Sequence, residues 1–385
     1  MAGALLDAIV VGGGIGGLSA AIALERTGAN AHVYEAATEL RPHGAGILVP
    51  PNALAVLARL GLARPVVDAG IAIERAELRE VNGACLVALD AARFAERWQH
   101  PMTAIRRSAL QEILLSALKP DALHLGKRLV DFEESGGSVR ARFADQSAAE
   151  GKILIAADGI HSTVRRRLFP EISLRNAGQT CFRGLARFRL ARGLEKTARE
   201  IWGGKYRFGF SAVGDGEVYW FAPVSLSRNL RLNGGDLKAK LLEAYRVFLR
   251  PVCDVIAATE PGAIIQTDLV DFVPGDRWHA GKVVLLGDAA HGATPNLGQG
   301  GAQAIEDALC LALKLRAMGF SASAFEAYER VRAPRAKKIV RLSREWGRLA
   351  HWENPFLRGA RDWLIRAIGQ RWQRRTLAEF FTPRV

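Results

Sequence analysis

The sequence is poor in the residues that build metal centres and disulfide frameworks. Its 385 residues include four cysteines and eight histidines. Neither type recurs at the short spacings of zinc sites, redox pairs or metalloprotease helices. We therefore expect no metal ion, and free thiols at the widely separated cysteines, which are Cys85, Cys181, Cys253 and Cys310.

Long apolar segments are also missing. No run of about 18 uncharged apolar residues occurs, which argues against a transmembrane helix. The stretch Met1–Asp7 lacks the basic residues that begin a secretory signal, and it leads directly into a glycine motif. These features predict a cytoplasmic protein. With 49% hydrophobic residues, the chain has enough apolar material for a large core and for two or three domains.

Positive charge is concentrated near the C-terminus. Of a formal net charge of +14, residues 331–385 supply most, because they hold 14 Lys and Arg against four acidic residues, whereas the preceding part holds 39 against 35. No nucleic-acid-binding signature accompanies this basic tail, so no nucleic-acid partner is expected. We interpret the tail as docked helices with a solvated basic face, and contact with an anionic membrane surface is the alternative.

The strongest local signal is a glycine-rich turn. Residues 7–11 are apolar and β-prone, residues 12–17 read GGGIGG, and an Ala-rich helical run follows. In a dinucleotide-binding unit, Gly12 permits the tight turn, Gly14 lets the backbone approach a pyrophosphate and Gly17 allows close helix packing. The phosphates then lie at the helix N-terminus, where free N–H groups favour anions.

A short second strand at residues 31–34 completes this unit. It ends at Glu35, whose carboxylate is placed to bind a ribose hydroxyl. The order of strand, turn, helix and strand predicts a parallel sheet with a right-handed crossover. The unit therefore indicates a bound dinucleotide.

Later segments predict that a second domain interrupts this nucleotide domain. Residues 152–157 and 283–286 read as buried parallel strands, whereas residues 178–224 alternate aromatic and polar side chains as an antiparallel sheet does. We expect a nucleotide domain at 1–177 and 263–330, with 70–105 as a segment that could join the substrate domain, a substrate-binding sheet domain at 178–262, and a basic C-terminal helical region at 331–385.

Smaller patterns predict individual elements. The SALQ sequence at 108–111 has capping-box spacing and should start a helix to about residue 118. Residues 127–132 and 138–143, separated by Ser-Gly-Gly, predict a hairpin. A long helix is expected at 299–315, and the chain after Pro334 reads as helical, with Asn354 as an N-cap before a proline.

Two further motifs are more specific. Residues 158–165 read DGIHSTVR, and GDAAH at 287–291 is followed by TPNLGQGG at 294–301. They resemble the DG and GD fingerprints of the class A flavoprotein aromatic hydroxylases, a family that includes salicylate, hydroxybenzoate and urate hydroxylases. The three motifs occur in the family's order, and the resemblance extends from Asp7 to about Arg366. It implies an α/β fold with a discontinuous GxGxxG FAD-binding Rossmann-type domain, an inserted antiparallel-sheet substrate domain and C-terminal helices.

The resemblance also assigns FAD contacts. Asp288 follows an apolar strand and would accept a ribityl hydroxyl, and Pro295 would line the ring near the site of oxygen attack. The glycines of 298–301 leave a helix N-terminus bare, so that its N–H groups can stabilise negative charge on the reduced flavin. Residues 43–52 resemble the loop that passes the flavin ring. The expected cofactor-binding residues are Gly12, Gly14, Gly16, Gly17, Glu35, Ala36, Gly46, Leu48, Arg107, Leu129, Asp158, Gly287, Asp288, Pro295, Gly298, Gln299, Gly300 and Gly301.

Several of these assignments leave alternatives open. Arg107 matches a family arginine that meets FAD, but the adjacent Arg106 competes for that role. Asp158 could hold the cofactor or form a structural turn that pairs with Arg165. We do not expect His291 to be a catalytic base, because no carboxylate stands at an informative spacing, and we take Glu306 and Asp307 as capping or packing partners.

Substrate selection is expected from the inserted sheet. Arg207 and Tyr219, together with Pro295, are the candidate substrate-positioning residues, and Arg207 could bind an oxyanion bidentately or be a surface arginine. Urate hydroxylases resemble the chain at Arg207 and Tyr219 but differ at Asn296, which weakens a urate assignment. Arg183 would share this slot with the interleaved aromatic residues Phe182, Phe208, Phe210 and Trp220.

The activity implied by the resemblance is an FAD-dependent monooxygenase. It would consume NADH or NADPH and O2 and hydroxylate a small aromatic, heteroaromatic or conjugated substrate through a flavin hydroperoxide. No second GxGxxG unit exists, so the nicotinamide must bind transiently. One alternative is a flavin-dependent reductase or dehydrogenase for isoprenoid or other lipid-like substrates, and another is a non-catalytic nucleotide-binding module. A monomer and a homodimer are both compatible with the sequence.

Overall fold

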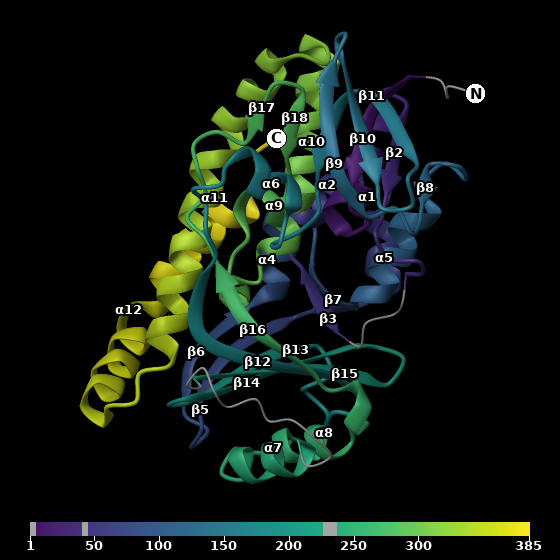
Figure 1. Cartoon of the computed structure of the whole chain (residues 1–385). Helices are drawn as coiled ribbons and strands as arrows, with labels where there is room; N and C mark the ends of the chain where they lie inside the picture. Colours follow the sequence, from purple (N-terminus) through teal and green to yellow (C-terminus); the bar gives the residue numbers. More distant parts are fainter. Residues whose placement is uncertain (1–4, 41–44, 226–236) are drawn as a thin grey trace.

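The computed structural model describes residues 5–40, 45–225 and 237–385, and Figure 1 shows their arrangement. One sheet and its helices form the upper part of the molecule in this view, and a second large sheet crosses below it. His43 and Gly44, which begin the expected flavin loop, lie outside the described residues.

The upper sheet has eight strands and contains the predicted strand, turn, helix and strand unit. The first strand pairs in parallel with β2 on one side and with β11 on the other, and β11 pairs in parallel with β18. The expected Rossmann-type sheet and the β9–β10 hairpin are therefore confirmed. Its strands are β1 (Leu6–Val11), β2 (Ala31–Tyr34), β8 (Leu123–His124), β9 (Leu129–Ser135), β10 (Ser138–Phe143), β11 (Ala148–Ala156), β17 (His279–Ala280) and β18 (Val283–Leu285).

The lower sheet has seven strands in the order β16-β12-β15-β14-β13-β5-β6. All neighbours pair antiparallel except β5 and β13, which are parallel. The strands β5 and β6 come from the earlier 70–105 segment, which therefore joins this sheet. The sheet begins before residue 178 and extends through β16, beyond residue 262. Its strands are β5 (Arg75–Glu80), β6 (Cys85–Asp90), β12 (Arg175–Arg187), β13 (Thr197–Gly203), β14 (Tyr206–Gly214), β15 (Glu217–Ser225) and β16 (Ile265–Asp271).

A small sheet joins the two large ones. Its central strand is β7, which pairs antiparallel with β3 and β4. Gly46 of β3 lies directly over Tyr219 of β15, since a Cβ atom at Gly46 would come within 2.5 Å of that side chain. This contact brings the flavin-loop strand onto the lower sheet. The strands are β3 (Gly46–Val49), β4 (Ile71–Ile73) and β7 (Met102–Arg106).

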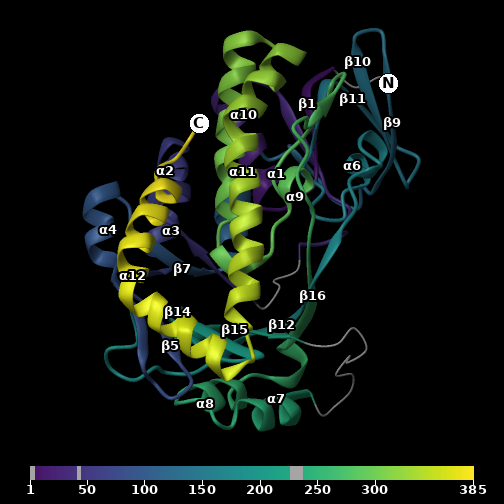
Figure 2. The same cartoon turned by 90° about the vertical axis from the view of Figure 1, so that its left-hand side faces the viewer.

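Helices cover the upper sheet and then descend along the side of the molecule (Figure 2). The central α10 packs between α1 and α11. Because α11 runs continuously through Pro334, the expected boundary at 330/331 lies inside a helix. The helices are α1 (Ile15–Arg26), α2 (Pro51–Arg59), α3 (Ala63–Asp68), α4 (Ala91–Trp98), α5 (Arg107–Ser116), α6 (Thr163–Leu168), α7 (Leu237–Tyr245), α8 (Val252–Ala257), α9 (Asp288–His291), α10 (Gly300–Met318), α11 (Ala322–Ala350) and α12 (Pro355–Phe381), with short 3-10 turns η1 (Pro261–Ala263) and η2 (Pro295–Leu297).

Two helix starts test the capping predictions. Asn354 caps α12 as expected, because its Oδ1 accepts the N–H groups of Phe356 and Leu357. The capping box at Ser108 is wrong: α5 already begins at Arg107, and its N-cap makes no side-chain hydrogen bond. Ser108 instead lies in the first turn of a helix that follows directly from β7.

Candidate functional site

In the glycine turn between β1 and α1, two glycines are required by the packing of the fold, and one is not. Gly12 has φ +109°, and a Cβ atom at Gly17 would overlap the carbonyl oxygen of Gly12. These two glycines are therefore required by the packing itself. A Cβ atom at Gly14, by contrast, would meet nothing within 4 Å. The first turn of α1 also has neither a side-chain cap nor an acidic residue, which leaves its N–H groups available to an anion.

Glu35 fixes this turn from the end of β2. Its Oε2 accepts the Gly13 N–H at 2.6 Å, and its Oε1 accepts the Ala37 N–H at 2.8 Å. Gln111 of α5 donates to the Gly13 carbonyl at 3.0 Å. Each carboxylate oxygen of Glu35 retains acceptor capacity, so the geometry accommodates the predicted ribose contact.

The three sequence motifs meet at one edge of the upper sheet. Gly12, Asp158 and Asp288 follow β1, β11 and β18, which are consecutive parallel strands. The carboxyl ends of such strands form the usual ligand crevice of open α/β sheets. Asp288 is exposed at the start of α9, and its Oδ1 lies 3.7 Å from where a Gly300 Cβ would be. Thus the GD carboxylate faces the N-terminus of α10.

Asp158 has one satisfied and one unsatisfied oxygen. Its Oδ2 accepts the N–H groups of Thr163 and Val164, whereas its buried Oδ1 has no hydrogen-bond partner among the described residues. The alternative interpretation, a structural turn in which Asp158 pairs with Arg165, is wrong, because the two side chains form no hydrogen bond or ion pair. Arg165 donates instead to the carbonyl oxygens of Ala289 at 3.1 Å and Ile160 at 2.5 Å, so that it ties the DG segment to the GD segment.

The N-terminus of α10 is bare, as predicted. Gln299 precedes the helix without capping it, and the first turn has no acidic residue. Ile47 of β3 packs against this turn, since its Cδ1 lies 3.0 Å from where a Gly301 Cβ would be. Pro295 is exposed at the start of η2, immediately before this turn. The flavin-loop strand, the proline turn and the helix N-terminus therefore border the same space.

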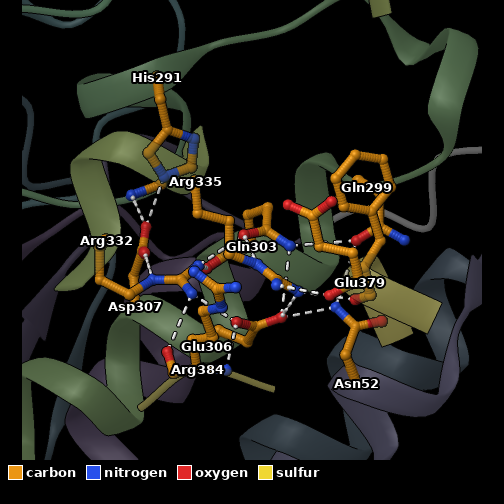
Figure 3. Close-up of polar contacts among 12 residues, drawn as sticks. Asn52, His291, Gln299, Gln303, Glu306, Asp307, Arg332, Arg335, Glu379 and Arg384 are labelled. Atoms are coloured by element: carbon orange, nitrogen blue, oxygen red, sulfur yellow. Dashed lines mark hydrogen bonds and ion pairs between the residues drawn. The ribbon is translucent and has the colours of Figure 1, made fainter. Parts of the chain in front are cut away.

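A buried polar network joins His291, which ends the GD segment, to Asp307 and Arg332 (Figure 3). Asp307 of α10 accepts the Gly287 N–H at 3.1 Å, and it contacts His291 Nε2 at 2.5 Å and Arg332 Nε at 2.6 Å. Burial alone would raise the pKa of Asp307, but the charges of His291 and Arg332 lower it to about 2. His291 thus has the carboxylate partner that the sequence did not reveal.

The network continues to the C-terminus of the chain. Glu306, which is fully buried, accepts from Asn52 at 2.6 Å, from Arg335 at 3.1 Å and from Arg332. Asn52 also donates to Gln299, just before α10. Backbone carbonyls of residues 379–384, and Gln303, accept from both arginines, and the Arg384 N–H donates to Glu306. Glu306 and Asp307 are therefore members of a buried ion network rather than capping residues.

The lower sheet presents a different face to the site than expected. Side chains alternate along strands, and register pairs share a face. Arg183 pairs with Phe221, and Ser211 pairs with Tyr219, which touches β3. The aromatic residues expected between them point the other way and are buried against α7 and α8, namely Phe182, Phe208, Phe210 and Trp220.

Arg207 is neither a surface arginine nor an unpaired anchor. It is 1% exposed, and its guanidinium binds Glu200 and, at 2.7 Å, Asn296 Oδ1. Asn296 follows Pro295 and also donates to Thr294 and Ser343. These contacts use three of the five N–H donors of Arg207. Arg207 therefore connects the lower sheet to the proline turn.

Arg183 and Arg107 are better placed to meet a ligand. Arg183 is half-buried on the face shared with Tyr219, and its buried Nε has no hydrogen-bond partner within the described chain. Arg106 forms ion pairs with Asp215 and Glu217 at the β14–β15 turn, whereas Arg107 is exposed at the start of α5. This geometry favours Arg107 over Arg106 as the cofactor arginine.

The remaining predicted residues lie close to this region or in the core. Ala36, Gly46 and Leu48 are half-buried in segments that border it, whereas Leu129 is buried in the main core at the start of β9. Among residues 5–40, 45–225 and 237–385, no cluster of three or more His, Cys, Asp or Glu side chains is arranged to hold a metal ion.

FAD fits the donors and acceptors assembled here. The uncapped α1 terminus suits a diphosphate, Asp288 and the orphaned Asp158 Oδ1 suit hydroxyl or amine donors, and the bare α10 terminus suits an electron-rich ring edge. The family model described as FAD binding domain matches residues 6–343. The chain belongs to the class A FAD-dependent aromatic hydroxylases.

Individual family members match almost the whole chain. The aurachin C monooxygenase/isomerase of Stigmatella aurantiaca is 35% identical over 94% of both chains. The FAD-dependent urate hydroxylase of Klebsiella pneumoniae is 35% identical over 90% of this chain and 91% of its own. The crystal structure of Klebsiella pneumoniae HpxO with FAD and uric acid superposes with a TM-score of 0.90 at 31% identity, covering 98% of this chain and 97% of that one. The chain is thus an FAD-dependent monooxygenase family member, with FAD as its cofactor.

Proposed function

We propose that this monooxygenase consumes NADH or NADPH and O2 to hydroxylate a small heteroaromatic or otherwise conjugated substrate. One observation carries the proposal: Gly46 of β3, in the expected flavin loop, lies against Tyr219 on the side of the lower sheet that also carries Arg183 and Phe221. FAD bound beside this polar and aromatic surface would suit a planar substrate that stacks and accepts hydrogen bonds. The name of the Klebsiella urate hydroxylase supports a heteroaromatic substrate class.

Bound FAD would supply the redox and oxygen-activating chemistry, and the chain would supply position and charge. We assign the diphosphate to the α1 N-terminus and Arg107, a ribose to Glu35 and the ribityl chain to Asp288. The N–H groups of α10 would stabilise negative charge on the ring. Pro295 and Ile47 of β3 would border the isoalloxazine ring of FAD and exclude water from it.

Substrate positioning is assigned to Tyr219, Arg183 and Phe221. Burial raises the pKa of Tyr219, so its hydroxyl stays protonated and can donate a hydrogen bond at neutral pH. The unsatisfied Nε of Arg183 is a second donor, and an oxyanion or carbonyl of the substrate would satisfy it. Phe221 lies across Gly209, where any Cβ would overlap its ring, and offers an aromatic contact.

Arg207 and Asn296 would shape the wall of this pocket rather than act alone. Their hydrogen bond holds Asn296 beside Pro295, and Glu200 neutralises the guanidinium. A substrate group could still accept from the two remaining N–H donors of Arg207. The pocket therefore favours a neutral or singly charged heteroaromatic ring over a strongly anionic one.

A substrate panel tests the proposal. Phenols, hydroxybenzoates, hydroxypyridines, purines and quinolones would be scored for hydroxylated product under 18O2, with NAD(P)H and oxygen consumption recorded together. We expect one labelled oxygen atom in the product of a heteroaromatic substrate. NAD(P)H oxidation with reduced product and no oxygen uptake would instead support the lipid-substrate reductase and overturn this proposal.

The Arg183 assignment has its own test. Arg183→Gln should raise KM for the best substrate by about tenfold or more, because a charged hydrogen bond contributes about 1.5–3 kcal/mol. FAD content should not change. Arg187→Gln, an exposed position near the end of the same strand, is the matched control. Equal KM values for the two variants would remove Arg183 from the pocket.

A further inference from the structure

The first half of α12 exposes apolar side chains to solvent. Phe356 is 88% exposed and Trp363 is 68% exposed, and Leu357 and Leu364 are each about half exposed. These positions, with the exposed Ala360 and Ala367, recur at helical spacing and so form one stripe. Figure 2 shows α12 on the outside of the molecule, beside α11. We call these six residues the α12 apolar face.

The orientation of α12 is fixed by polar residues on its inner side. Arg361, 3% exposed, binds Asp362 at 2.7 Å and donates to the Leu349 and Ala350 carbonyls at the end of α11. Its guanidinium also lies 4.8 Å from the centroid of the Trp202 ring. A rotation that hid the apolar face would break this set of contacts. In the first half of α12, Arg361 and Asp362 are thus buried while Phe356 and Trp363 are exposed, the reverse of an ordinary surface helix.

An apolar groove opens beside this face. It lies between α11, α12 and β6, has a volume of about 490 Å³, and is lined mainly by apolar side chains, among them Leu342, Trp346, Leu349, Trp352, Leu364 and Ile365. Trp352 and Leu364 are also among the exposed large apolar residues. The groove and the α12 apolar face are therefore one continuous apolar surface.

The positive charge around this surface favours an anionic lipid surface over a second copy of the chain as its binding partner. Residues 331–385 carry an excess of ten positive charges in the sequence, but Arg332, Arg335 and Arg361 are buried in ion pairs. Arg348 and Arg366 are exposed beside the groove and the face, where Arg366 pairs with Glu80 and the groove lining also includes Glu345. In a symmetric dimer the same patch would meet itself and bring like charges together. An anionic lipid surface complements both features, because Trp and Phe enter the interfacial region while Arg and Lys meet the phosphates.

We propose that the α12 apolar face and the adjacent groove dock this protein onto an anionic phospholipid bilayer. Phe356 and Trp363 enter the headgroup and acyl boundary, the groove accepts an acyl chain, and the basic residues of α11 and α12 contact lipid phosphates. Within the described residues no helix has the length and hydropathy of a membrane span. The contact is therefore interfacial and reversible. This inference does not depend on the substrate or on catalysis.

Vesicle co-sedimentation of the FAD-loaded protein tests the proposal. Vesicles of phosphatidylcholine alone are compared with vesicles that also contain phosphatidylglycerol, at low and high salt. We expect binding only to the anionic vesicles, and weaker binding at high salt. The double variant Phe356→Ser, Trp363→Ser should reduce the partition coefficient by about tenfold or more. Val273→Ser, at a position that is 61% exposed and lies outside α11 and α12, is the control and should bind as the native chain does.

Two measurements decide against the proposal. If the native protein sediments equally with both vesicle types, or with neither, the anionic bilayer is not the partner. If light scattering shows a native dimer that the double variant converts to a monomer, the face belongs to a second copy of the chain. Unchanged thermal midpoint and FAD content in the double variant establish that folding is not the cause of lost binding.

Discussion

Replacing Gly14 with alanine should weaken FAD binding while leaving the stability of the FAD-free protein nearly unchanged. Gly14 adopts φ −77° and ψ 179°, which alanine tolerates, and a new Cβ would meet no atom within 4 Å. The unfolding free energy of the FAD-free protein should change by less than about 1 kcal/mol. The added methyl group would, however, occupy the space in which we place the diphosphate.

Crowding of a well-packed contact by one methyl group costs about 1–3 kcal/mol. Gly14→Ala should therefore weaken FAD binding by about 5- to 150-fold. Gly17→Ala is the contrasting variant, because its Cβ would overlap the Gly12 carbonyl oxygen. That variant should lose about 3 kcal/mol or more of stability even without FAD.

The assay is FAD titration of the deflavinated proteins, followed by quenching of flavin fluorescence, with urea unfolding of the same samples. If Gly14→Ala binds FAD as tightly as the native chain, the diphosphate does not lie against this turn. If it unfolds as readily as Gly17→Ala, the open space at Gly14 is not a ligand space.

The remaining predictions concern the GD turn, the buried networks and pH. Asp288→Ala should fold normally but purify with little FAD, and full occupancy would refute the ribityl assignment. Arg207→Ala should raise the substrate KM and also destabilise the chain, since Glu200 loses its charged partner and keeps the Trp202 N–H; kinetics and stability that both match the native protein would remove it from the site. Arg332→Met should cost about 3–5 kcal/mol in urea unfolding, because the buried carboxylates of Glu306 and Asp307 lose the arginine that they share, and a loss under about 1 kcal/mol would show that this network is dispensable. Burial and the nearby Arg207 charge lower the pKa of His351 to about 4, so the stability that its neutral form contributes is present above about pH 6.5 and is lost as the pH falls toward 4. This histidine should by itself lower the free energy of unfolding by about 2 kcal/mol at pH 5 relative to pH 7, and His351→Gln should remove that share of the pH dependence.

Local patterns predicted the cofactor part of the site. The GGGIGG turn, the Glu35 strand end and the two aspartate motifs each follow a strand, and parallel strands bring their carboxyl ends to one edge. Likewise the Asn354 cap depends only on neighbouring residues and was confirmed. Such features can be read from sequence because the chain itself fixes the geometry.

Features that depend on long-range packing could not be read in this way. Asp307 reaches His291 because α10 folds back against the GD turn, and no spacing rule encodes that approach. Alternation in β14 and β15 divided the side chains into two sets, but only the packing of α7 and α8 decides which set faces the core. The parallel pairing of β5 with β13 is equally invisible locally, since it joins segments about 120 residues apart.

The central claim is that the three glycine and aspartate turns together bind one FAD molecule. Its most direct test is the flavin content of the purified, desalted chain before and after incubation with FAD. We expect a yellow protein with an equimolar amount of FAD after incubation. A colourless protein that takes up no FAD under native conditions would contradict the assignment of this crevice and the oxygenase proposal that depends on it.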